Sequence, residues 1–152
     1  MPTKISIVLS LTAVLLGACS ERVKDTHPQQ LVTKRQEMFK AMTRALEPMG
    51  LVARERESYN RASFQARALE LQDLATQPWA LFSADGNYPP TRAKPEVWQK
   101  AADFKQAQAR FQALTADLVK VSGSADMPAI RSAVDAVEKS CKSCHEQFRN
   151  ER

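Results

Sequence analysis

Hydrophobic residues recur at intervals of three and four along most of the chain, which is the period of an amphipathic α-helix. This rhythm predicts four helices, over residues 28–46, 57–76, 96–122 and 127–149. The stripe of the last helix is the most regular, with successive spacings of 4, 3, 4, 3 and 4 between Ile130, Val134, Val137, Cys141, Cys144 and Phe148. Because the other faces are polar, each helix must bury its stripe against another element.

Proline and glycine mark where these helices are expected to stop. Pro48 and Gly50 indicate that the first helix ends near Leu46, and Gly123 ends the third. Residues 77–95 hold four prolines and one glycine, which predicts a long connection between the second and third helices. Four amphipathic helices with one long crossover predict an all-α fold, an antiparallel four-helix bundle, which builds cofactor sites from side chains in its core.

The composition agrees with one helical domain. A chain of 152 residues is the length of a single domain, and 4 glycines are few. Lys and Arg number 22 against 17 Asp and Glu, and the net charge of +5 is spread along the chain. No basic run is interleaved with aromatic residues, so nucleic acid is not an expected partner.

The first residues look like an export signal. Lys4 precedes an apolar stretch at 5–16 that is too short for an ordinary transmembrane helix, and Leu-Gly-Ala-Cys follows at 16–19. We interpret residues 1–18 as a bacterial lipoprotein signal peptide and Cys19 as the lipidated mature N-terminus, with residues 19–27 as a tether and 28–152 as the bundle. A plain secretory signal is the alternative. Either signal exports the protein, and lipidation would place it in the periplasm, anchored to a membrane.

The run Cys141-Lys-Ser-Cys144-His145 is a candidate attachment site for one covalent haem c. The two thiols would bond to the haem vinyl groups, and the imidazole of His145 would bind the iron. A zinc site would need a second ligand cluster, but only Cys19 and His27 remain. A thioredoxin-like pair would follow a strand, and no strand pattern lies nearby.

Together these features resemble the class II c-type cytochromes, the cytochrome c′ family. The resemblance rests on four segments: CKSCHEQFR at 141–149, LVTKRQEMFK at 31–40, WALFSAD at 79–85 and KPEVW at 94–98. A haem motif near the C-terminus separates this class from class I cytochromes. The resemblance implies a four-helix bundle with covalent haem near the C-terminal helix.

The family divides by the residue that faces the iron opposite the proximal histidine. In low-spin members, which are electron carriers, this residue is a methionine. It lies four residues after a position that is often an arginine. In high-spin members it is an apolar residue, and the iron stays five-coordinate. Arg35 matches the reference position, so the resemblance implies Phe39 above the iron and an open site for nitric oxide or carbon monoxide.

Met38 and Met42 keep the alternative of a low-spin electron carrier open. A shift of one residue would place Met38 over the iron, and Met42 lies one turn from Phe39 on the same face. Helix geometry favours Phe39, because Met38 is rotated by about 100° from the stripe.

The resemblance also suggests further partners. Arg149 matches a basic residue beside the proximal histidine, where it could contact the haem propionates or a ligand. We expect redox proteins as further partners, and the lipid would add a membrane. High-spin members of the family often form dimers through their first two helices, so a homodimer is also an open alternative. We expect no enzymatic activity: a peroxidase needs a distal His and Arg, but His27 lies in the tether and Arg35 a full turn from the distal position.

Overall fold

The computed structural model describes residues 23–124 and 126–151. Four long helices form the molecule: α1 Leu31–Ala53, α2 Arg61–Leu74, α4 Ala101–Ser122 and α5 Met127–Phe148. Shorter helical segments join α2 to α4: η1 Trp79–Phe82, η2 Ala84–Gly86 and α3 Glu96–Gln99. The predicted all-α bundle is confirmed. The proposed signal peptide at 1–18 and Cys19 lie outside the described residues.

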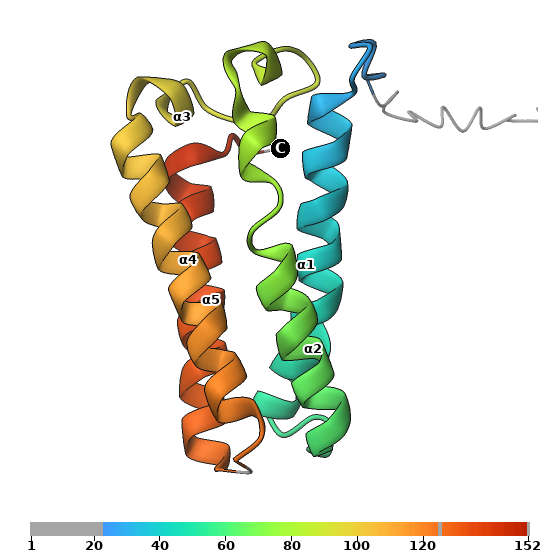
Figure 1. Cartoon of the computed structure of the whole chain (residues 1–152), viewed down its shortest axis with the longest axis vertical. Coiled ribbons are helices and arrows are strands. Elements are labelled where there is room, and N and C mark those ends of the chain that lie inside the picture. Colours follow the sequence, from blue (N-terminus) through green and yellow to red (C-terminus); the bar gives the residue numbers. More distant parts are fainter. Residues whose placement is uncertain (1–22, 125, 152) are drawn as a thin grey trace, which may run out of the picture.

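The four long helices form a ring in which each packs against two neighbours. The contacts are α1 with α2, α2 with α4, α4 with α5, and α5 with α1, and adjacent helices run in opposite directions (Figure 1). The predicted stripes of α2 and α5 supply the centre of the core. Their buried members are Phe64, Ala68, Leu71, Ile130, Val134 and Val137.

The first helix is longer than the sequence predicts. It continues through Pro48 to Ala53 instead of ending near Leu46. Met49 and Val52 are buried in these extra turns, and their burial outweighs the hydrogen bond that proline removes. Gly50 is also buried within the helix, and its missing side chain leaves room for the paired side chains of Arg54 and Glu138.

The predicted third helix is interrupted. Lys100 leaves the helical conformation, with φ −116° and ψ 50°, and separates α3 from α4. Trp98 donates its indole N–H to the carbonyl oxygen of Phe82 at 2.9 Å, which ties the single turn of α3 to η1. The long connection does not run the full length of the bundle: α2 ends partway along it, and residues 77–95 continue from there and fold over the end where α4 begins (Figure 1).

Residues ahead of α1 are docked on the bundle. Gln30, at the N-cap, makes no side-chain capping bond. Asp25 caps the helix instead, because its Oδ2 accepts from Thr33 N at 2.9 Å and from Thr33 Oγ1 at 2.8 Å. The hydroxyl of Tyr88 accepts from Val32 N at 3.2 Å, so the connection supplies a second cap.

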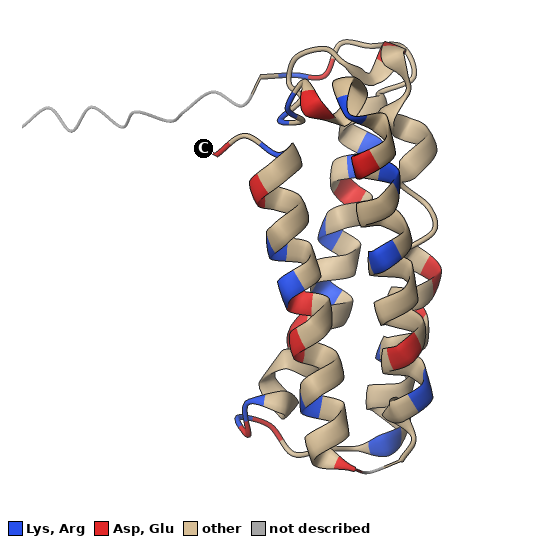
Figure 2. Cartoon of the chain, turned by 90° about the vertical axis from the view of Figure 1, so that its left-hand side faces the viewer, with Lys and Arg blue, Asp and Glu red and all other residues tan. Residues whose placement is uncertain are grey.

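The outer faces carry both signs of charge. Lys, Arg, Asp and Glu alternate along the helices in Figure 2, in agreement with the even charge distribution of the sequence. Among residues 23–124 and 126–151, no helix is both long and apolar enough to cross a bilayer.

Candidate functional site

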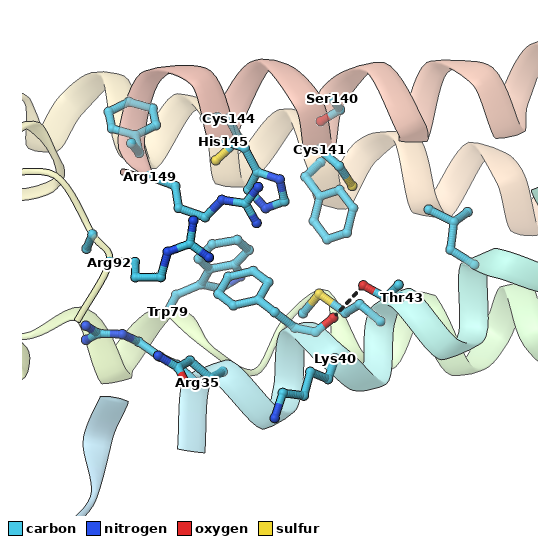
Figure 3. A pocket seen from close by; sticks show the side chains of 18 of the residues that line it. Arg35, Lys40, Thr43, Trp79, Arg92, Ser140, Cys141, Cys144, His145 and Arg149 are labelled. Carbon is cyan, nitrogen blue, oxygen red and sulfur yellow. Dashed lines mark hydrogen bonds between the residues drawn. The ribbon is translucent and has the colours of Figure 1, made fainter. Parts of the chain in front are cut away.

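The site is a cavity of about 640 Å³ between α1 and α5, closed on a third side by residues of η1 and α4. Its size is within the range of pockets that hold cofactors and other small molecules. Side chains from helices that are distant in the sequence meet here (Figure 3).

One wall is the C-terminal part of α5. Cys141, Cys144 and His145 all line the cavity, and each side chain is partly buried. Both thiols are free of disulfide bonds. Cys141 and His145 are four residues apart, one turn of helix, and therefore project from nearly the same face. The three residues that the sequence singled out for haem attachment are thus brought together on one cavity wall.

The opposite wall is α1. Arg35, Phe39 and Met42 line the cavity, whereas Met38 is not among the lining residues. Phe39 is partly buried, and its ring packs edge-on against Trp79 and Phe82, with centroid distances of 5.9 and 6.2 Å. The helix geometry expected from the sequence therefore holds for this wall: Phe39 faces α5 across the cavity and Met38 is turned away.

Aromatic rings fill the space behind Phe39. Trp79 is central, because its indole also contacts Phe104 at 6.0 Å and Phe111 at 6.5 Å. Its N–H donates to the carbonyl oxygen of Ala75 at 2.7 Å, so the ring is held in place by the end of α2. Such a lining excludes water and suits a large planar apolar group.

Three arginines gather at one end of the cavity. Arg35 is buried, donates to the carbonyl oxygen of Leu81 at 2.8 Å and to the hydroxyl of Thr91, and lies over the ring of Phe82 at 4.5 Å. Arg92 and Arg149 lie beside His145 (Figure 3). Arginine pairs well with carboxylates, so this end suits an anionic edge of a bound group.

Burial and these cations shift the pKa values of the histidine and the two cysteines of the site. Burial, helped by Arg149 and Arg92, lowers the pKa of His145 to about 4, so its imidazole is neutral at pH 7, the form that binds metals. Burial, with Cys144 and Glu138 nearby, raises the pKa of Cys141 to about 11. Burial also raises the pKa of Cys144, although Arg149 opposes this.

Sequence reasoning missed Arg92. It lies in the connection, where no helical period predicts its direction. Residues 92–94 pair with the end of α5: Asn150 N donates to Arg92 O at 2.8 Å, and Lys94 N donates to Phe148 O at 2.9 Å. This contact, between segments more than fifty residues apart, carries Arg92 to His145 and has no signal in the local sequence.

Comparison with known proteins now adds to this geometry. A sequence model of the family described as cytochrome C′ matches residues 30–149. The chain belongs to the cytochrome c′ family.

Individual relatives support this family membership. Cytochrome c′ of Alcaligenes xylosoxydans is 32% identical over 128 residues, which cover 82% of this chain and 97% of that protein. A solved structure of the Alcaligenes protein, a ferrous variant with bound NO, is similar with a TM-score of 0.78 at 29% identity, covering 85% and 100% of the two chains. A variant with bound carbon monoxide gives 0.77 at 30% identity, covering 84% and 100%.

Members of the family bind covalently attached haem c, and Cys141 and Cys144 of this chain fit the attachment motif. The residues present also fit the group on their own chemistry. The aromatic cavity suits the apolar macrocycle, and the two thiols suit its thiol-reactive groups. The neutral imidazole suits the metal, and the arginines at one end suit the carboxylates. This cytochrome c′ homologue is a haem c protein.

Proposed function

We propose that this protein binds small uncharged gases, nitric oxide and carbon monoxide, at a five-coordinate haem iron. His145 is the protein ligand, and Phe39 covers the opposite face. The observation that carries the proposal is the position of Phe39 on the cavity wall facing α5, because a phenyl ring cannot bind a metal. The haem supplies the iron and its redox chemistry; the chain decides which ligands reach that iron.

The aromatic residues behind Phe39 support selectivity for uncharged ligands. Phe39 touches two rings and so has little freedom to swing aside. Lys40 also lines the cavity beside Phe39, but its ammonium group already pairs with Glu37 Oε1 at 2.6 Å. The rings of Phe39, Trp79 and Phe82 offer an anion no hydrogen-bond partner, so an anionic ligand among them would lose hydration without compensation. The solved relatives with bound NO and CO support the same ligand class.

Met42 favours a second candidate, a low-spin electron carrier with Met/His ligation. It lines the cavity one turn from Phe39 and is 6% exposed. Its burial among other core residues is also what a gap-filling methionine shows, and Phe39 lies nearer the His145 end of α1. We therefore place Met42 in the core and keep ligation as the competing outcome of the test.

The experiment is a ligand titration of the purified, reduced, haem-loaded protein followed by its optical spectrum. Nitric oxide and carbon monoxide are compared with azide and cyanide on the same sample. The proposal expects saturable spectral changes with the two gases and weak or no response to the anions. Equal binding of anions would contradict an apolar distal face, and no response to either gas would indicate that Met42 occupies the sixth position.

We further propose that the protein is exported and held at a membrane by lipid on Cys19, that it exchanges electrons with redox partners, and that it has no enzymatic activity of its own. The sequence of residues 1–19 supports the anchor, and the absence of a histidine other than His145 from the cavity lining, as far as the structure describes it, argues against peroxidase chemistry. Acylation is tested by the mass of the N-terminal peptide from cell membranes.

A further inference from the structure

The haem-binding end of the bundle is also the end where the N-terminal tether attaches. We use the term haem end for residues 23–35, 79–95 and 142–151, which lie together at the top of Figure 1. The opposite end carries residues 54–60, the end of α4 and the start of α5. If Cys19 is attached to a membrane, the position at which the chain enters the domain therefore determines which end of the bundle lies close to that membrane.

Residues 25–30 do not add to the free length of the tether, because they are fastened to the bundle. Asp25 holds Thr33 through two hydrogen bonds and receives the backbone N–H of His27 at 3.1 Å. The ring of His27 stacks on Tyr88 with a centroid distance of 4.8 Å. We use the term arm for the stretch between Cys19 and the docked Asp25, which are six positions apart in the sequence.

The length of this arm limits the orientation of the domain. Six residues span at most about 21 Å when fully extended. Helix α1, with 23 residues, is about 35 Å long. An arm so much shorter than the bundle cannot reach past it, so the haem end cannot point away from the surface that holds Cys19. If residues 25–30 were undocked, the arm would reach about 40 Å and this restriction would disappear.

We infer that the haem end of this protein faces the bilayer, so that His145 and the arginines beside it lie close to the lipid headgroups while the opposite end points away. The inference rests on the proposed lipidation of Cys19. The partner surface is a phospholipid bilayer, and the redox partners that fit this orientation are membrane proteins or lipid-soluble carriers.

The surface of the haem end is compatible with this position. Val23 is 63% exposed and, together with Leu69, is one of the two exposed large hydrophobic residues in the described part of the chain. Its Lys and Arg residues number seven against four Asp and Glu, and this net positive charge is compatible with anionic lipid headgroups. The orientation itself follows from the short arm.

The test uses the haem itself as a quencher. The lipidated, haem-loaded full chain is inserted into phospholipid vesicles that carry a headgroup-labelled fluorescent lipid whose emission overlaps the haem absorption. The matched variant carries a Gly/Ser insertion of about 40 residues after Ser20, whose root-mean-square length of roughly 35 Å equals the bundle. Bound protein is normalised by haem absorbance.

The inference expects strong quenching by the native chain and a several-fold weaker effect from the insertion variant. Equal quenching by the two proteins would overturn it. If the full chain does not stay bound to the vesicles, the inference is overturned as well, because the lipid then does not anchor the protein. Neither result alters the gas titration, so the gas-binding proposal stands or falls separately.

Discussion

Phe39 is the residue on which the gas-binding proposal depends most directly. Its ring lies on the wall opposite His145 and is held by Trp79 and Phe82. Replacing Phe39→Ala removes the ring and should raise the carbon monoxide affinity of the reduced protein by about tenfold or more, the effect of relieving about 1.4 kcal/mol of crowding. Carbon monoxide titration measures this.

The matched control is Phe64→Leu, a core substitution on α2 outside the haem cavity. It should lower stability and leave the affinity unchanged. If Phe39→Ala also leaves the affinity unchanged, the ring does not cover the ligand site.

The two methionines of α1 provide a test of the competing ligation. Met42→Leu and Met38→Leu nearly conserve side-chain volume and should cost less than about 1.5 kcal/mol. If neither sulfur binds iron, the optical spectrum of both variants matches that of the parent protein. A change from a sharp to a broad Soret band in one variant alone would identify that methionine as a ligand and contradict the proposal.

At the scale of elements, the connection from α2 to α4 shapes one side of the site. A Cβ on Gly86 would lie 2.5 Å from the carbonyl oxygen of Leu81 and 2.8 Å from Arg35 Nη1. Gly86→Ala should therefore displace η1 or Arg35 and lower the free energy of unfolding by about 1–3 kcal/mol. Urea unfolding of the haem-loaded protein measures this.

Gly123→Ala is the control for that substitution. Its Cβ would meet only the side chain of Gln65, at 3.5 Å, and its φ of −96° suits any residue. We expect no loss of stability, and a small gain from the stiffer unfolded chain. Equal destabilisation by the two alanines would show that the contact with Arg35 does not matter.

The start of α1 should respond to pH through Asp25. Burial alone would raise the pKa of Asp25, but hydrogen bonds from Thr33, Tyr88 and His27 together hold it below its usual value. A lowered folded-state pKa means that the carboxylate stabilises the fold above the ordinary aspartate pKa of about 3.9, and that this contribution is lost as the pH falls through the lower folded value.

Thermal unfolding of the parent and Asp25→Asn across pH checks this. The parent should be more stable near neutral pH, and the two curves should converge in acid. Asp117→Asn removes an exposed ion pair with Lys120 and should have little effect at any pH. A difference between the parent and Asp25→Asn that is independent of pH would contradict a role for the carboxylate charge.

At the scale of the whole molecule, the sequence predicted what depends on local periodicity. The stripe of α5 places Ile130 and Val134 in the core and directs Cys141 and Cys144 to the cavity, because helix geometry alone relates them. The family and its fold were predicted correctly for the same reason: each helical stripe, and each of the four segments that carry the resemblance, is local in the sequence.

What could not be predicted depends on contacts between distant segments. Pro48 does not end α1, because the burial of Met49 and Val52 in the core outweighs the local preference. The capping of α1 by Asp25 and the position of Arg92 beside His145 are set by segments that meet only in the folded chain. Arg35, Phe39 and Arg149 line the cavity as the resemblance implied, while their contacts with haem stay predictions.

The most direct test of the central claim is the optical spectrum of the reduced, haem-loaded protein before and after adding carbon monoxide. Five-coordinate iron beneath Phe39 predicts a broad high-spin Soret band that sharpens when the gas is added. A sharp low-spin spectrum that carbon monoxide does not change would contradict the account. It would mean that a methionine of α1 fills the sixth position and that the protein is an electron carrier without an open ligand site.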